Sequence, residues 1–195
     1  MLREKLKNHT IILASSSPRR QQFFRELDLD FIIQIKEVEE IYPKELEGTE
    51  ITDFLADLKS KPFTNLSKND LLITSDTIVW LHDKALGKPK NKDEAFTMLK
   101  ELSGKKHEVI TSISIKSVAF QKIINDITTV YFKEITDEEI NYYVKNYKPF
   151  DKAGAYGIQE WLGFIAIHKM EGSYFNVVGL PIHKLYKEVS HEAFV

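Results

Sequence analysis

Apolar and polar positions along the chain predict strands that are separated by helices. Apolar runs at residues 11–14 and 31–35 predict two strands, and a longer apolar run predicts a third at 71–81. From 109 to 115 the pattern alternates, with Val109, Thr111, Ile113 and Ile115 on one face, and residues 127–132 supply a partner run. These last two segments predict an antiparallel pair.

Helix start and stop signals fall between the predicted strands. Thr136-x-x-Glu139 has the spacing of a capping box, and Ser17 followed by Pro18 is a typical helix start. The expected helices begin at Pro18, near Ile51 (ending near Lys61), after Asn91, after Thr136 and after Pro181. A further strand is expected around 164–168.

The order of these elements predicts an α/β fold. Helices that alternate with mixed strands indicate a domain built around one twisted sheet. A chain of 195 residues with 43% hydrophobic content can bury a full core. No repeat, low-complexity tract or linker divides it, so we expect one bilobed domain over residues 1–195.

Composition and charge exclude several function classes. The chain has 27 basic and 29 acidic residues, a net charge of −2, which implies no bulk attraction to nucleic acid or membranes. It has no cysteine, which excludes disulfides, thiolate zinc sites and a cysteine nucleophile. Only four apolar residues follow the charged N-terminus, whereas a secretory signal needs roughly 7–15. We therefore expect a cytoplasmic protein.

The segment Ser15–Arg20 is the first candidate for chemistry. It places Arg19 and Arg20 in the first turn of a helix, where cations are normally unfavourable. An anion would complete the arrangement, because backbone N–H groups, serine hydroxyls and guanidinium groups would converge on a phosphate. The alternative is a solvated arginine pair on an exposed turn.

Acidic residues provide the second candidate. Asp76 interrupts a strongly apolar strand, which is costly unless the carboxylate is paired or functional. It could act as a general base or as a metal ligand, or it could be a turn-forming residue. Together with Glu40 it would suit Mg²⁺ or Mn²⁺, whereas a solvated acidic loop is the alternative for Glu40. Thr77 could bind a ligand or simply suit a strand.

Two lysines and a glycine-rich run complete the candidates. Lys59 and Lys88 could each place a charge on a phosphate, although most lysines are solvated. The run 153–157 contains neither the phosphate-loop motif nor a dinucleotide fingerprint, but its small residues would let a ligand approach the backbone. Gln159 follows and offers an amide to a base edge; a tight strand connection is the alternative.

Taken together, these segments resemble the Maf family of nucleoside triphosphate pyrophosphatases. The matching segments occur in the family's order and span nearly the whole chain. They are Leu13–Arg20, Val38–Glu40, Ser75–Val79, Gly87–Pro89, Leu102–Gly104, His107–Thr111, Asp151–Gln159 and Gly179–Pro181. Two positions depart from the usual pattern: Ser75 replaces a small apolar residue, and Ser60 replaces the alanine after Lys59.

The resemblance implies a fold similar to that of inosine triphosphate pyrophosphatases, with a cleft between two lobes. It also implies metal-dependent cleavage of a nucleoside triphosphate to the monophosphate and pyrophosphate. Asp76 matches the catalytic proton acceptor, and Glu40 matches an acidic position near the metal. The positions that match triphosphate-binding residues are Ser15, Arg19, Arg20, Lys59 and Lys88. The positions that mark the branch cleaving dTTP and UTP are Arg19, Thr77 and Gln159.

Two functional hypotheses follow. The first is a pyrophosphatase that acts on dTTP and UTP, or on modified pyrimidine nucleotides, with Mg²⁺ or Mn²⁺. The alternative is a nucleotide-binding regulator of cell division and septum formation that acts without turnover. The intact Asp76 favours the enzyme, because a pure binder would do better without a carboxylate beside the phosphates. The expected partner is a nucleoside triphosphate, and a homodimer is one of the oligomeric states left open.

Overall fold

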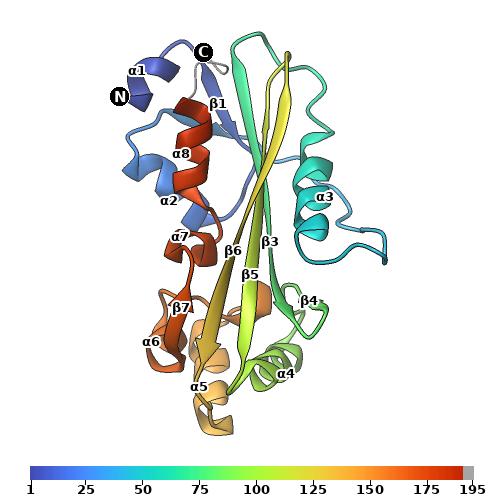
Figure 1. Cartoon of the computed structure of the whole chain (residues 1–195), viewed down its shortest axis with the longest axis vertical. Helices are drawn as coiled ribbons and strands as arrows, with labels where there is room; N and C mark the ends of the chain where they lie inside the picture. The colour runs from blue at the N-terminus through green and yellow to red at the C-terminus, as the bar shows by residue number, and fades with distance from the viewer. Residues whose placement is uncertain (191–195) are drawn as a thin grey trace. The chain divides into compact units, whose positions relative to one another are not determined.

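The structure is a computed structural model that describes residues 1–190. Within this range seven strands form one mixed sheet, in which the neighbours follow the order β2-β1-β3-β5-β6-β7 and β4 pairs with β3 (Figure 1). Eight α-helices and one short 3₁₀ helix accompany the sheet. The predicted α/β class with a mixed sheet is therefore confirmed.

The elements have the following bounds. The strands are β1 (Thr10–Leu13), β2 (Phe31–Ile33), β3 (Asp70–Leu81), β4 (Lys84–Leu86), β5 (Lys106–Lys116), β6 (Gln121–Phe132) and β7 (Ile167–Glu171). The helices are α1 (Leu2–Leu6), α2 (Pro18–Glu26), α3 (Thr49–Ser60), α4 (Lys92–Leu102), α5 (Asp137–Tyr147), η1 (Ala153–Ala155), α6 (Trp161–Ala166), α7 (Tyr174–Val178) and α8 (Ile182–Ser190). None of the helices within residues 1–190 combines the length and apolar character needed to cross a membrane.

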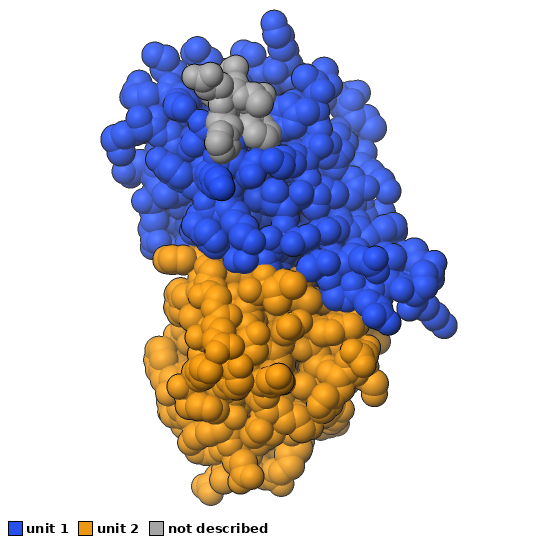
Figure 2. All heavy atoms as spheres, in the orientation of Figure 1, with its two compact units in different colours: residues 1–76, 111–126, 179–195 blue, residues 77–110, 127–178 orange. Residues whose placement is uncertain are grey.

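The chain folds into two compact units (Figure 2). The first unit contains residues 1–76, 111–126 and the chain from 179 onward, and the second contains residues 77–110 and 127–178. Each unit is thus assembled from separate stretches of sequence. The single domain expected over residues 1–195 stays a prediction.

The first unit is built on parallel strands. β1 pairs in parallel with β2 and with β3, in a register that places Leu13 beside both Ile33 and Ile73. Leu13 and Leu72 have no exposed surface. A parallel strand that is buried on both faces reads as a continuous apolar run, which is why these strands could be recognised from sequence. Helix α1 packs against α8 in this unit (Figure 1).

The second unit contains the antiparallel hairpin of β3 and β4. The two strands pair Val79 with Leu86 across a turn at His82 and Asp83, whose φ angles are +48° and +58°. Positive φ at both central residues is the geometry that suits a two-residue hairpin. Strand β4 was not predicted from the sequence. Helices α4 and α5 pack together over this unit's apolar core.

The predicted helix starts are present in the structure. The Ser17 hydroxyl accepts from the N–H of Arg20, and Thr136 with Glu139 forms both bonds of a capping box. Asn91 accepts from the N–H of Glu94, but the Glu94 carboxylate accepts from the N–H of Lys90 instead of the cap residue. Side-chain caps therefore fixed these helix boundaries locally.

The strand predicted at 164–168 is wrong in its first half. Residues 161–166 form helix α6, and strand β7 begins only at Ile167. Leu162 and Ala166 are buried at a spacing of four, whereas the Phe164 side chain is 73% exposed. A short run that is apolar throughout carries no periodic signal, so burial of one helical face decided its structure.

Candidate active site

Asp76, Lys59 and Glu40 form an ion cluster in the first unit. The Lys59 Nζ lies 2.6 Å from Asp76 Oδ1 and 3.1 Å from Glu40 Oε1. The exposed fractions of the three side chains are 8% for Asp76, 17% for Lys59 and 48% for Glu40. One ammonium thus lies between two carboxylates that come from different parts of the chain.

The strand geometry of β3 explains why Asp76 meets Lys59. The Thr74 hydroxyl donates to the Ala56 carbonyl on α3 at 2.5 Å, so the side chain of Thr74 points toward that helix. Side chains two apart in a strand share a face, and Asp76 therefore points toward α3 as well. Lys59 lies in the last turn of α3. Because β3 runs unbroken from 70 to 81, the alternative that Asp76 forms a turn is wrong.

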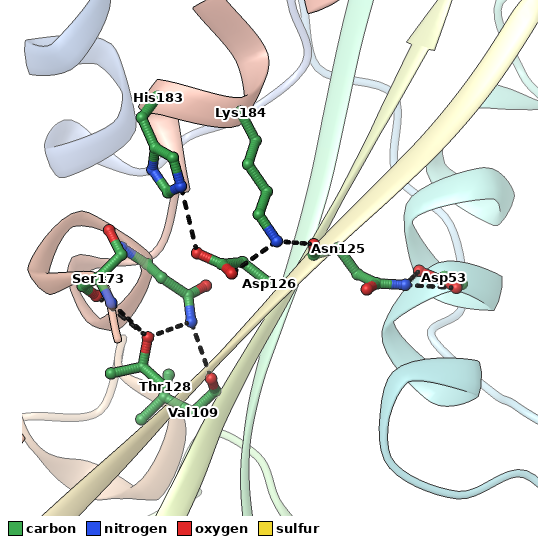
Figure 3. A network of polar contacts seen from close by, with 9 residues as sticks. Asp53, Val109, Asn125, Asp126, Thr128, Ser173, His183 and Lys184 are labelled. Atoms are coloured by element: carbon green, nitrogen blue, oxygen red, sulfur yellow. Dashed lines mark hydrogen bonds and ion pairs between the residues drawn. The ribbon is translucent and has the colours of Figure 1, made fainter. Parts of the chain in front are cut away.

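Helix α3 and helix α8 are each tied to β6 by polar contacts (Figure 3). The Asn125 amide donates to the Asp53 carboxylate on α3 at 3.0 Å. The neighbouring Asp126 binds the ammonium of Lys184 on α8 at 2.7 Å. Consecutive strand residues point to opposite faces, so one strand can hold two helices. The first contact anchors the helix that carries Lys59.

Ser15 and Ser17 shape the start of α2. The Ser15 hydroxyl accepts from the N–H of Ser17 at 3.2 Å, and the Ser15 carbonyl accepts from the Gln21 amide at 3.2 Å. Ser15 is buried, whereas Ser16 is exposed. The predicted cap is therefore present, and its backbone carries the partial positive charge of a helix N-terminus.

Arg20, a candidate phosphate ligand, is partly buried and also binds the protein backbone. Its Nε donates to the Gly179 carbonyl and its Nη1 donates to the Ser75 carbonyl, both at 2.8 Å. Burial lowers the pKa of Arg20 to about 10, while the charge of Asp76 opposes this shift. Even so, the guanidinium stays protonated at neutral pH. Arg20 therefore clamps the backbone next to Asp76.

Arg19 and Arg20 add positive charge to this cluster. The charge of Arg19 further lowers the pKa of Arg20, and the charge of Glu40 raises it, so all these groups interact. Counted with Lys59, the cluster contains three cationic side chains and two carboxylates. The cluster therefore has a net charge of about +1 and favours an anionic ligand.

Ser75 was not selected as a site residue from the sequence. Its hydroxyl is buried and has no hydrogen-bond partner within residues 1–190. Its carbonyl accepts from Arg20, so the residue beside Asp76 is held by its backbone. The available signal was a hydroxyl where the family pattern has a small apolar residue. An unpaired buried hydroxyl is costly, which makes Ser75 a candidate ligand contact.

Two further candidate segments come together in the second unit. The N–H of Gly154 donates to the Gly87 carbonyl at 3.0 Å, which joins the segment of Lys88 to the glycine-rich run. Gly154 has φ +65°, and a Cβ there would lie 2.6 Å from a methyl carbon of Val79. Only glycine satisfies both conditions. Lys88 is exposed, as a side chain that reaches for a ligand must be.

Gln159 and Thr77 are both partly buried residues of the second unit. The side-chain oxygen of Gln159 is buried, and no described residue hydrogen-bonds to it. Thr77 follows Asp76 directly on β3. A buried acceptor without a donor makes Gln159 a candidate ligand contact, and its role in base selection stays a prediction.

The donor set for a divalent cation consists of Glu40 and Asp76. No group of three or more histidine, aspartate or glutamate side chains suited to a metal occurs in the described range. Mg²⁺ is commonly held by one or two carboxylates together with substrate phosphates. The two carboxylates that share Lys59 fit that pattern, because their oxygens already converge on one cation.

Comparisons with known proteins point in one direction. The family model described as "Maf-like protein" matches residues 10–192. A protein of Flavobacterium johnsoniae named dTTP/UTP pyrophosphatase is 60% identical over 96% of this chain and 97% of its own. A protein of the same name from Flavobacterium psychrophilum is 58% identical over 100% of both chains. Another, from Phocaeicola vulgatus, is 46% identical over 95% of this chain and 97% of its own. The solved Staphylococcus aureus Ham1 protein aligns with a TM-score of 0.46 at 17% identity, over 66% of this chain and 72% of its own.

Proposed function

Because this chain belongs to the Maf family, we propose that it hydrolyses dTTP and UTP to the monophosphate and pyrophosphate. Relatives named dTTP/UTP pyrophosphatase match it over nearly the full length of both chains. The structural observation that carries the proposal is the Lys59 ammonium shared by Asp76 and Glu40, with Arg20 bound to the adjacent backbone.

Binding of the triphosphate is assigned to cationic and hydroxyl groups. Ser15 and the start of α2 would supply N–H and hydroxyl donors, and Arg19 and Lys88 would supply charge. Arg20 would act from its clamped position beside Asp76. These groups would stabilise the negative charge that grows on the leaving pyrophosphate.

Asp76 would act on the attacking water. As general base, it would take one proton from the water while the oxygen bonds to the α-phosphorus. The bond from the α-phosphorus to the bridging oxygen then breaks, and pyrophosphate leaves with that oxygen. Lys59 would hold the Asp76 carboxylate in position until substrate arrives, because Lys59 Nζ and Asp76 Oδ1 lie 2.6 Å apart.

Mg²⁺ or Mn²⁺ would be held by Glu40 and Asp76. When bound, such an ion supplies positive charge to the phosphate oxygens and orients them. Hard oxygen ligands match this ion class. Lys59 already holds the two carboxylates at a common point, so the chain needs no new backbone arrangement to present them.

Base selection is assigned to Arg19, Thr77 and Gln159. Uracil and thymine present acceptor, donor and acceptor along one edge, whereas cytosine presents acceptor, acceptor and donor. The buried oxygen of Gln159 would accept from the N3–H of uracil, which cytosine lacks. A polar site that is left unpaired by the wrong base rejects that base strongly.

A product assay tests this function. The purified protein is incubated with dTTP, UTP, CTP, ATP and GTP plus Mg²⁺, and pyrophosphate and orthophosphate are measured separately. We expect pyrophosphate from dTTP and UTP and no orthophosphate. Orthophosphate as the product would overturn the pyrophosphatase proposal, and binding without product would support the regulator instead.

We also propose that the protein works in the cytoplasm, without a nucleic-acid or membrane partner.

A further inference from the structure

Buried polar contacts hold the segment that carries Gln159. The hydroxyl of Tyr143 on α5 donates to Glu160 Oε2 and accepts from the N–H of Gly157 at 3.1 Å. The other oxygen of Glu160 lies 3.0 Å from the Nζ of Lys152. We call these three side chains the Tyr143–Glu160–Lys152 network. All of its residues, and Gln159, belong to the second unit.

This network is an unusual feature of an apolar core. Tyr143 has no exposed surface and belongs to the main apolar cluster of the second unit, and Lys152 is also buried. Burial raises the pKa of Tyr143, with a further rise from its hydrogen bond to Glu160, so its phenol remains a donor. Apolar residues of similar volume often give equal stability, whereas buried polar networks can specify one conformation.

The Tyr143–Glu160–Lys152 network contacts the chain on both sides of Gln159, at Gly157 and at Glu160. A Cβ on Gly157 would lie 2.9 Å from Glu160 Cδ and 3.1 Å from Lys152 Cε, so no side chain fits there unless the network moves. The N–H of Glu160 donates to the Gly157 carbonyl at 3.1 Å. Gly157 and Glu160 flank the segment of Gln159 and are both fixed by Tyr143.

A fixed backbone matters because an amide can present either of its two ends. By rotating about its last bond, Gln159 could offer an acceptor to uracil or a donor to cytosine. The Gln159 oxygen is buried and has no partner in the described part of the chain. Discrimination between the two bases therefore requires that the surroundings fix where this oxygen lies.

We propose that Tyr143 is a positioning residue for base selection, which acts through Glu160 and Gly157 on the orientation of Gln159. The inference rests on the proposed function, since it concerns how UTP is distinguished from CTP. Tyr143 touches no substrate in this scheme. Its contribution is to hold the backbone from which the Gln159 amide reaches the base, so that the amide oxygen keeps its buried position. The expected change therefore lies in the ratio of kcat/KM for UTP to that for CTP.

The test compares Tyr143→Phe with a matched control. Tyr143→Phe removes the hydroxyl and leaves the ring. Tyr131→Phe removes a hydroxyl that also binds a glutamate, Glu171 on β7, in the same unit. We expect Tyr143→Phe to lower the UTP/CTP ratio at least about tenfold and Tyr131→Phe to change it less than about twofold. Thermal melting of each variant shows whether it is folded.

A double-mutant cycle separates positioning from general loss of stability. If Tyr143 acts through Gln159, Tyr143→Phe should leave the ratio of the Gln159→Ala enzyme unchanged. A merely structural residue would lower the melting temperature without changing the ratio. Should Tyr143→Phe fail to fold, Glu160→Gln replaces it, because that change keeps an oxygen for the Tyr143 hydroxyl and weakens the bond to Lys152.

Each outcome has one meaning. A wild-type enzyme that cleaves UTP and CTP equally overturns the proposed base selection and this inference together. A wild-type enzyme that prefers UTP, with the same preference in folded Tyr143→Phe and Glu160→Gln, overturns only the role of Tyr143. An equal fall of the UTP/CTP ratio in Tyr131→Phe also overturns the role of Tyr143, because the Tyr131 hydroxyl belongs to a different contact.

Discussion

The Nζ of Lys59 lies 2.6 Å from Oδ1 of Asp76 and, at the same time, 3.1 Å from Oε1 of Glu40. Two carboxylates that converge on one point repel each other unless a cation lies between them. In the described structure the ammonium of Lys59 provides that cation. A Mg²⁺ ion that uses the same oxygens would therefore compete with Lys59, which then becomes available to a phosphate.

We first predict that Asp76→Asn keeps the fold and triphosphate binding but removes most turnover. An amide has nearly the same shape as the carboxylate, yet it neither accepts a proton nor binds a cation well. Loss of a general base typically lowers a rate about 10²–10⁴-fold. Initial rates of pyrophosphate release from UTP, with UTP binding measured by calorimetry, check this. Near wild-type turnover would remove Asp76 from the mechanism.

The shared ammonium leads to the second prediction, on metal binding. Lys59→Met should tighten the binding of Mn²⁺ to the nucleotide-free protein and should lower turnover. Removing a positive charge beside two carboxylates leaves their oxygens to the metal ion. Electron paramagnetic resonance of free Mn²⁺ measures the affinity. Lys61→Met is the control, because the exposed Lys61 pairs with a different carboxylate, that of Asp57 on α3. Equal Mn²⁺ affinity in Lys59→Met and wild type would contradict the competition.

The third prediction concerns Arg20, which supports the backbone beside Asp76. Arg20→Ala should weaken all triphosphates about equally, because neither a phosphate contact nor a backbone clamp reads the base. It should also lower the free energy of unfolding by about 1–3 kcal/mol for each carbonyl, at Ser75 and Gly179, that is left unpaired. Urea unfolding and KM values for UTP and dTTP measure the two effects.

Arg25→Ala serves as the control for Arg20. Arg25 lies on the same helix, is exposed, and donates to the side-chain oxygen of Gln21, so its loss should change neither quantity noticeably. A loss confined to one base in Arg20→Ala would instead assign Arg20 to the base contact.

The fourth prediction is a pH dependence of stability that depends on His107. Burial lowers the pKa of His107 to about 3 in the folded protein, below the unfolded value of about 6.5. The unfolded chain therefore binds a proton that the folded chain rejects, so stability is full above pH 6.5 and falls as the pH drops toward 3. The slope should approach roughly 1.4 kcal/mol per pH unit.

His107→Gln isolates this contribution from that of the carboxylates. Glutamine can keep a hydrogen bond to the Tyr156 hydroxyl, which lies 2.8 Å from the His107 ring. Urea unfolding between pH 4 and 8 should show a difference between wild type and variant that shrinks as the pH falls. A difference independent of pH would mean that His107 does not titrate in this range.

Local signals in the sequence predicted much of the fold. The Ser17 and Thr136 caps act within one helical turn, so residue types at fixed spacing were sufficient to place α2 and α5. The run 161–166 lacked such a signal, because it is apolar throughout, and its helix depended on what it packs against.

The sequence predicted which residues belong to the site but not which of them contact one another. Asp76 and Lys59 were both candidates, but their contact joins β3 to α3 across 17 positions, and no local rule predicts it. The same holds for Arg20, whose partner Gly179 lies 159 positions away. Ser75 was not selected as a candidate ligand contact because its burial without a hydrogen-bond partner is visible only in three dimensions.

The last prediction concerns base selection by Gln159. Wild-type protein should cleave dTTP and UTP far better than CTP or purine triphosphates, and Gln159→Ala should lower kcat/KM for UTP much more than for CTP. The Gln159 oxygen is buried and without a donor. It would accept from the N3–H of uracil or thymine, but it would face a lone pair in cytosine. Such a mismatch costs several kcal/mol in a fixed polar site, whereas the thymine methyl needs only a small apolar space. Steady-state kinetics on the five triphosphates check the ratio, and Gln121→Ala, which removes an amide from the first unit, is the control. Comparable wild-type rates on CTP and UTP would overturn the role of Gln159 in recognising the pyrimidine base, even if pyrophosphate release is observed.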